Sequence, residues 1–272
     1  MLHGRECASI QGDAPCSIES QIRAMTKRQR NTYFQCQQFR IEQQGAAMKV
    51  TTDTCTLGAW VPVEGAQRVL DIGTGSGLLA LFAAQRAPRA QVDAIELDAE
   101  AAAQAKANFE SSPFASRLKL IEGDILTFEP SEGYDAILCN PPFFSESTPN
   151  NCERLRQARH DNTLSLTALL DALQRLLLSE GSAYLLLPTD CAAQLLPGLD
   201  QHGLHLRRRL QLISQPGDTP HRWILGLSKT PGGVIEESLT LYTEHPVHSR
   251  EAGRLFYPYY TRLRCEADDY VR

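Results

Sequence analysis

Short apolar runs alternate with amphipathic segments through the middle of the chain, and this pattern predicts the secondary structure. Short apolar runs are typical of buried strands, whereas apolar residues three or four positions apart are typical of helices. Strands are therefore expected at 69–72, 91–95, 118–121 and 134–139, and helices at 78–86 and 99–109. Strands that alternate with helices predict an α/β fold, in which helices cover both faces of a parallel sheet.

The flanking segments predict further elements. Residues 33–41 alternate weakly, like a short half-exposed strand. A helix is expected at 54–60, with Thr52 or Asp53 as its cap. Later patterns indicate helices at 164–178 and 191–202, a buried strand at 183–187, and a hairpin of strands at 206–213 and 221–228, with Arg207, Arg208 and Arg209 at a strand edge.

The first part of the chain differs from the rest in composition. Residues 1–32 lack apolar periodicity and are rich in Gln, Ser, Arg and Cys. This composition is typical of a basic, mobile arm rather than a packed domain. We therefore expect an N-terminal arm at 1–32, followed by a single domain at 33–272.

The net charge of −5 does not exclude a nucleic-acid partner, because the charge is unevenly spread. Residues 91–135 carry ten acids and three bases, a net charge of −7, so the remainder of the chain is +2. A polyanion responds to the local field and not to the net charge. No apolar run reaches the ~18 residues of a membrane span, and no signal peptide is evident, so a cytoplasmic location is expected.

The eight cysteines do not predict a metal site. They contain no C-x-x-C motif and are scattered along the chain. Scattered cysteines without a secretion signal are expected to be reduced thiols. We predict that the protein binds no metal.

A glycine-rich turn, Asp71-Ile72-Gly73-Thr74-Gly75-Ser76-Gly77, follows the first strand of the alternating pattern. Such a turn, between a strand and a helix, is where an α/β fold binds ligands. Its G-x-G-x-G spacing differs from the dinucleotide fingerprint G-x-G-x-x-G, and a carboxylate at Asp71 would repel a pyrophosphate. A carboxylate can instead accept hydrogen bonds from a cationic amino-acid group. Asp71, Gly73, Gly75 and Gly77 therefore predict a site for S-adenosylmethionine, which carries an ammonium and a sulfonium.

Acidic residues also end the next two strands. Glu96 stands about twenty residues beyond the glycine turn, where an acid in a nucleoside-binding sheet accepts the ribose hydroxyls. Asp124 follows the third strand and could accept from the adenine amino group, while Ile125 covers the ring. Lys49 and Thr52, together with Asp53, precede the first core strand and are second-rank candidates for the donor pocket. Asp98 is expected to cap the following helix.

The fourth strand ends in Asn140-Pro141-Pro142-Phe143. Two prolines could simply end the strand. The chemical interpretation is that the Asn140 side-chain oxygen and the Pro141 carbonyl each accept one N–H of a planar amino group, leaving its lone pair aimed at the donor methyl. Phe143 offers a face on which a planar group can stack. The motif therefore predicts methyl transfer to a conjugated nitrogen.

Basic residues flank this motif on both sides in the sequence. The polar segment 145–162 lacks periodicity, and a long loop beside an active site often binds substrate. An RNA substrate would be held through its phosphates. The candidate substrate-binding side chains are Lys27, Arg28, Arg30, Arg154, Arg156, Arg159 and His160.

The two motifs, at 71–77 and 140–143, resemble those of class I S-adenosylmethionine-dependent methyltransferases that modify amino groups. More narrowly, the segments at 47–50, 58–60, 70–80, 96–97, 101–105 and 157–159 look like those of bacterial tRNA(Val) (adenine-N6)-methyltransferases. The resemblance implies a Rossmann-like fold with a mostly parallel, seven-stranded sheet. It also implies methylation of N6 of the adenine 3′ to the anticodon, with tRNA as partner, Asn140 to Phe143 as catalytic motif, and Asp71, Glu96 and Asp124 as donor contacts. The first 30 residues depart from that family because they are longer than expected, and a monomer is expected.

Other functions remain open at this point. A protein glutamine-N5 methyltransferase shares the Asn-Pro-Pro core, but its helical substrate-binding domain has no counterpart in the Gln-rich segment before Met48. A guanine-N2 rRNA methyltransferase would carry a second large domain ahead of the sheet. A non-catalytic RNA-binding scaffold would keep the glycine turn but would not need Asn140.

Overall fold

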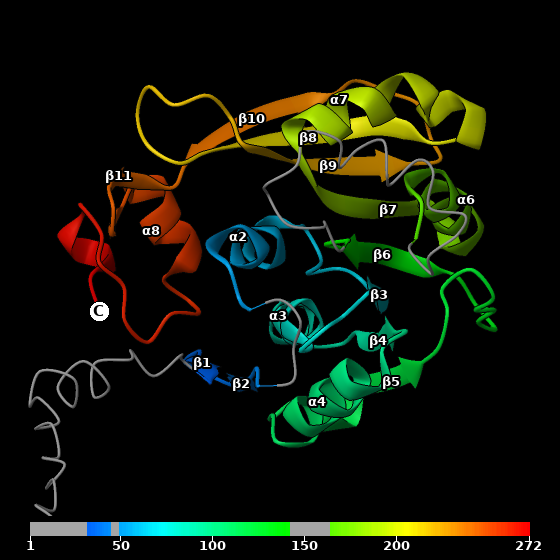
Figure 1. Cartoon of the computed structure of the whole chain (residues 1–272), viewed down its shortest axis with the longest axis horizontal. Helices are drawn as coiled ribbons and strands as arrows, with labels where there is room; N and C mark the ends of the chain where they lie inside the picture. Colours follow the sequence, from blue (N-terminus) through cyan, green and yellow to red (C-terminus); the bar gives the residue numbers. More distant parts are fainter. Residues whose placement is uncertain (1–31, 45–48, 142–163) are drawn as a thin grey trace, which may run out of the picture. The chain divides into compact units, whose positions relative to one another are not determined.

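A single mostly parallel sheet forms the centre of the computed structural model, which describes residues 32–44, 49–141 and 164–272 (Figure 1). Within these residues the sheet has eight strands in the order β10-β8-β9-β7-β6-β3-β4-β5. The strands are β3 (Arg68–Ile72), β4 (Gln91–Glu96), β5 (Leu118–Glu122), β6 (Tyr134–Cys139), β7 (Leu177–Pro188), β8 (His205–Ile213), β9 (Arg222–Ser228) and β10 (Ile235–Thr240). Strands β5, β4, β3, β6 and β7 are parallel neighbours, whereas β9 runs antiparallel to β7 and β8.

Helices cover both faces of this sheet, because successive strand residues point to opposite faces and both faces are apolar. One face packs Val69 and Val92 against the helices α2 (Thr52–Trp60), α3 (Leu78–Arg86), α4 (Ala99–Glu110) and α8 (Arg250–Phe256). The other face packs Leu70 and Ile72 against α6 (Leu166–Leu176) and α7 (Thr189–Leu195). The α/β class with a mostly parallel sheet is thus confirmed.

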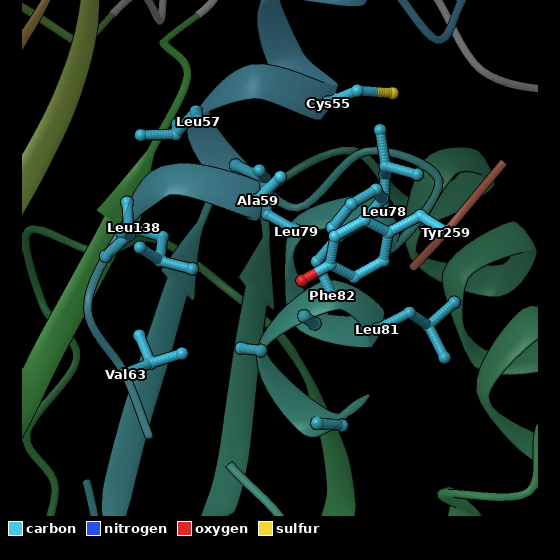
Figure 2. Packing of buried hydrophobic residues seen from close by; sticks show 14 of the residues in the cluster. Cys55, Leu57, Ala59, Val63, Leu78, Leu79, Leu81, Phe82, Leu138 and Tyr259 are labelled. Carbon is cyan, nitrogen blue, oxygen red and sulfur yellow. The ribbon is translucent and has the colours of Figure 1, made fainter. Parts of the chain in front are cut away.

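The packing of α2 on α3 matters most for the candidate site. A Cβ atom at Gly58 would lie 2.8 Å from Phe82 Cγ, so only glycine lets the two helices approach this closely. Tyr259 packs on the other side of Phe82, with ring centroids 4.4 Å apart. Figure 2 shows these rings in one cluster with Leu57 of α2 and Leu138 of β6. This buried cluster holds α2 firmly against the sheet.

Shorter elements surround the sheet. Two antiparallel pairs lie outside it, formed by β1 (Tyr33–Gln35) with β2 (Arg40–Glu42) and by β11 (Tyr242–Glu244) with β12 (Val247–His248). Three 3₁₀ turns are η1 (Ala115–Arg117), η2 (Leu196–His202) and η3 (Asp268–Tyr270) within the described part of the chain. The described residues belong to one compact unit, Thr32–Arg272, and the arm expected at 1–32 lies outside them except for Thr32.

The structure corrects the expected strand count and the position of three arginines. The sheet contains eight strands in its described part rather than seven, because β10 pairs in parallel with β8. Strand β8 is therefore an interior strand, and Arg207 to Arg209 do not lie at an edge. Arg208 and Arg209 form ion pairs with Glu237 and Glu236 of β10.

Several element boundaries also differ from expectation. The segment 191–202 is not one helix, because α7 gives way at Leu196 to the 3₁₀ turn η2, where Pro197 has no backbone N–H to donate. The weak alternation at 33–41 resolves into β1 and β2, and the buried strand at 183–187 begins earlier, at Leu177. The cap of α2 is Thr51 and not Thr52 or Asp53, since the Thr51 side chain accepts from Thr54 N. The expected hairpin of β8 and β9, and the Asp98 cap of α4, are confirmed.

Four of the cysteines, Cys36, Cys55, Cys139 and Cys265, are buried free thiols. Cys191 is an exception to the expectation of reduced thiols, because it is disulfide-bonded. In the part of the chain that the structure describes, no helix is both long and apolar enough to cross a bilayer. The same residues contain no cluster of three or more His, Cys, Asp or Glu side chains that could hold a metal ion.

Candidate active site

The strand register brings the predicted site residues to one edge of the sheet. Ile72 at the end of β3 pairs with Ile95 of β4 on one side and with Cys139 of β6 on the other. The next residue in each case, which is Gly73, Glu96 or Asn140, therefore lies at the same edge of the sheet. From β3 the chain order runs outward in both directions, and an open α/β sheet binds ligands at such a switch point.

The glycine turn has a backbone that glycine adopts more readily than any other residue. Gly73, Gly75 and Gly77 have φ values of 64°, 56° and 89°, a region that favours glycine. Gly77 starts α3, and a Cβ atom there would lie 2.4 Å from Phe109 Cε1. A Cβ atom at Gly73 or Gly75 would meet no atom within 4 Å. The first two glycines thus face open space that a ligand could use, whereas the third is required by helix packing.

The side chain of Asp71 stabilises this turn through hydrogen bonds. The side chain is fully buried, and its Oδ2 accepts from Thr74 Oγ1 at 2.5 Å and from the backbone N–H of Ala80 at 3.0 Å. Its Oδ1 is buried with no hydrogen-bond partner among the described residues. Burial, with a smaller contribution from the charge of Glu96, raises the pKa of Asp71 to about 7, although the bonds from Thr74 and Ala80 favour the ionised form. In this conformation Asp71 has no surface for a ligand, so any role in donor binding acts through the turn.

Glu96, at the end of β4, is oriented by three backbone N–H groups. Its Oε1 accepts from Leu97 N and Asp98 N at 3.0 Å each, and its Oε2 accepts from Gly75 N at 2.8 Å. A carboxylate has about four lone-pair positions, so roughly one remains for a ligand. Accepting both ribose hydroxyls would therefore require Glu96 to release a backbone donor. Leu97, which was not among the candidate residues from the sequence, follows Glu96 directly and is 56% exposed.

Asp124 and Ile125 lie in the turn after β5. Asp124 Oδ1 accepts from the backbone N–H of Leu126 at 2.9 Å, and Ile125 is buried. Arg175 of α6 donates to the backbone carbonyls of Ile125 and Phe128. This arginine, which sequence reasoning did not select, fixes the turn that carries both predicted donor contacts.

Asn140 is held by a residue of α2. Its Nδ2 donates to Thr54 Oγ1 at 3.0 Å, while Pro141 is buried directly after it. The sequence contains no local signal for this contact, because the two residues are 86 positions apart. Pro142 and Phe143, the rest of the predicted catalytic motif, lie outside the described residues.

The second-rank candidates in front of α2 have different positions. Lys49 is exposed. Thr52 Oγ1 forms a hydrogen bond of 2.9 Å with Tyr242 Oη, and Asp53 contacts His221 Nε2 and Arg222 Nε at 3.2 and 3.3 Å. Thr52 and Asp53 thus anchor α2 to the carboxyl-terminal part of the chain, and a role for Lys49 and Thr52 in donor binding stays a prediction.

The predicted substrate-binding side chains all lie outside the described residues, so their role also stays a prediction. They are Lys27, Arg28, Arg30, Arg154, Arg156, Arg159 and His160.

The chain is similar to known methyltransferases. The family model "Methyltransferase small domain" matches residues 47–160, which include the glycine turn and Asn140. The tRNA1(Val) (adenine(37)-N6)-methyltransferase of Bacteroides thetaiotaomicron is 37% identical over 235 residues, which are 86% of this chain and 99% of that protein. The protein of the same name from Tolumonas auensis is 41% identical over 233 residues, 85% of this chain and 97% of that protein.

A solved structure supports the fold alone. The structure described as a predicted O-methyltransferase from Agrobacterium tumefaciens superposes with a TM-score of 0.56. It is 18% identical and covers 75% of this chain and 94% of that one.

Proposed function

The chain belongs to the family of tRNA1(Val) (adenine(37)-N6)-methyltransferases, and from this premise we propose that it methylates N6 of adenine 37 in a tRNA for valine. It is an S-adenosylmethionine-dependent methyltransferase. The tRNA for valine and the position of the adenine are those in the names of its relatives.

The carboxyl edge of the sheet fits the methyl donor in shape and in charge. Gly73 and Gly75 face open space, since a Cβ atom at either position would meet nothing within 4 Å. Glu96 ends β4, the strand beside the turn, and Asp124 follows β5, the next strand outward; two carboxylates here suit a ligand with an ammonium and a sulfonium. We assign Glu96 to the ribose, and Asp124 and Ile125 to the adenine, of the donor.

The donor, when bound, supplies a methyl group activated by the positive charge on its sulfur. The chain has to present a nitrogen whose lone pair is delocalised into the adenine ring. Asn140 Oδ1 and the Pro141 carbonyl would accept the two N–H groups of the adenine amino group and direct its lone pair toward the methyl. No base has to act first, because an amino proton becomes acidic only as the new C–N bond forms and the bond from the donor sulfur to the methyl breaks. S-adenosylhomocysteine would then leave, and the amino proton would pass to water.

One observation carries this proposal. The pairing of Ile72 with Cys139 sets Asn140 beside the glycine turn, so the amide assigned to the acceptor and the turn assigned to the donor lie at one edge of the sheet. The candidate residues Glu96, Asp124 and Asn140 come from one chain, so a monomer would contain all three of them. A tRNA substrate supports a cytoplasmic location.

The experiment is transfer of a labelled methyl group from S-adenosylmethionine to a transcript of the tRNA for valine. We expect label in the transcript with adenine at position 37 and none in a matched transcript with guanine there. Label in a release-factor protein, with none in either transcript, would instead support the glutamine-N5 alternative.

A further inference from the structure

The first turn of α2 contacts the end of strand β6 through the hydroxyl group of Thr54. Thr54, in that turn, receives a hydrogen bond of 3.0 Å from Asn140 Nδ2. Asn140 is the residue whose carboxamide oxygen has to face the acceptor amino group. The contact with Thr54 uses the other end of the same carboxamide.

The hydroxyl of Thr51 favours this arrangement, in which Asn140 Nδ2 donates to Thr54 Oγ1. Thr54 Oγ1 lies 2.9 Å from Thr51 Oγ1, and either hydroxyl can donate in that contact. When Thr54 donates to Thr51, its lone pairs are left for Asn140 Nδ2. Thr51 Oγ1 also accepts from the backbone N–H of Thr54, so both hydrogen bonds use it as acceptor. These successive hydrogen bonds, from Asn140 to Thr54 and from Thr54 to Thr51, then keep Asn140 Oδ1 turned away from α2.

Thr54 can act in this way because α2 is anchored on several sides. Asp53 contacts His221 and Arg222 at the start of β9, and Thr52 contacts Tyr242 of β11. Further along α2, Cys55, Leu57 and Ala59 are buried in the core cluster around Phe82 (Figure 2). A side chain on a rigid element holds its partner more accurately than one on a loop.

We propose that Thr54 is a positioning residue for methyl transfer, which fixes the plane and direction of the Asn140 carboxamide. This inference rests on the proposed role of Asn140. Thr54 itself touches neither the donor nor the acceptor in this scheme, so it affects the rate of the chemical step and not the binding of either substrate.

The test compares Thr54→Val with Thr54→Ser, and uses Thr56→Val as a matched control. Valine keeps the shape of threonine but removes the hydroxyl, whereas serine keeps the hydroxyl. Thr56 lies in the same helix and is fully buried, but its hydroxyl donates to Thr52 O and not to Asn140. All three variants are assayed under single-turnover conditions with saturating donor and tRNA, because product release then does not limit the rate.

We expect Thr54→Val to lower the single-turnover rate by about 10- to 100-fold, as for misplacement of a reacting group by ~1 Å. The dissociation constants of S-adenosylmethionine and tRNA should stay unchanged, Thr54→Ser should keep most of the rate, and Thr56→Val should match the wild type. An unchanged rate in Thr54→Val, or an equal loss in Thr56→Val, would overturn the inference. Absence of tRNA methylation by the wild-type protein would instead overturn the proposed function, so the two failures are distinguishable.

Discussion

At the scale of single residues, Asn140 after β6 and Asp71 near the end of β3 are polar groups with different expected roles. Asn140 is partly buried and has one described hydrogen bond, to Thr54, so its carboxamide oxygen remains available. Asp71 is fully buried, and one of its carboxylate oxygens accepts hydrogen bonds from Thr74 and Ala80. The first residue is therefore expected to affect chemistry, and the second to affect the turn and its stability.

Replacement of Asn140 by alanine should lower kcat by about 10²- to 10³-fold, the usual cost of losing one preorganised transition-state hydrogen bond. The affinity for S-adenosylmethionine should be nearly unchanged, because the amide is assigned to the acceptor. Single-turnover assays and calorimetric titration measure the two quantities separately. Substantial methyl transfer by this variant would mean that the Asn-Pro-Pro turn is only structural.

Asp71 should make folding stability depend on pH in an unusual direction. Its pKa is about 7 in the folded protein and has an ordinary value of 3.8. Between these values the folded protein keeps a proton that the unfolded chain has lost, so the free energy of unfolding falls as the pH rises and levels off above 7. Each pKa unit corresponds to ~1.4 kcal/mol, so the full effect is about 4 kcal/mol.

The matched comparison is Asp71→Asn, which cannot ionise. The difference in free energy of unfolding between the wild type and this variant should fall from about pH 4 to pH 7, as measured by urea unfolding across that range. A difference that does not change with pH would show that Asp71 is ionised in the folded protein throughout.

At the scale of elements, the turn after β5 depends on α6 for its shape. Arg175 of α6 binds the carbonyls of Ile125 and Phe128, and the same turn carries Asp124. Among the described residues, β5 is the outermost strand of the sheet on that side, and none of their strands lies beyond it to support the turn. A helix on the face of the sheet thus maintains one wall of the proposed donor site.

Arg175→Gln should weaken donor binding by about 1 kcal/mol, the net value of a typical hydrogen bond, or roughly fivefold in Kd. Arg117→Gln is the control, because Arg117 also donates to three backbone carbonyls, those of Ala84, Ala87 and Ala90. Calorimetry should show weaker binding of S-adenosylmethionine for Arg175→Gln only. Equal affinities in both variants would show that the shape of the turn after β5 does not affect donor binding.

At the scale of the whole molecule, charge is divided between regions. The segment 91–135, which includes Glu96 and Asp124, has a net charge of −7, and the rest of the chain is +2. The acidic segment suits a cationic donor, whereas tRNA phosphates need basic side chains outside it. Arg154, Arg156 and Arg159 supply such charges close to Asn140 in the sequence.

Replacing these three arginines by glutamine should weaken tRNA binding and reduce the slope of log K against log salt by roughly two units. The affinity for S-adenosylmethionine should not change, because the donor site is assigned to other residues. Filter-binding titrations at several salt concentrations measure the slope. An unchanged slope would place the phosphate contacts elsewhere, with Lys27, Arg28 and Arg30 as the next candidates.

The amino-acid sequence by itself determined the features that depend on neighbouring residues. The strand-to-helix alternation, the positive φ values at Gly73, Gly75 and Gly77, and the Asp98 cap of α4 were all predictable, because each depends on local backbone preference or on side chains within one turn. Parallel strands place their carboxyl ends together, so the meeting of Gly73, Glu96 and Asn140 also followed from the pattern.

Only the tertiary structure decided the contacts between distant residues. The sequence pattern did not reveal β10, because only one of its residues is buried and its place in the sheet depends on pairing with β8 and on the ion pairs of Glu236 and Glu237 with arginines of that strand. The hydrogen bond from Asn140 to Thr54 and the complete burial of Asp71 likewise depend on how α2 and α3 pack against the sheet. The packing of these elements results from many weak interactions across the fold, and no short stretch of sequence specifies it.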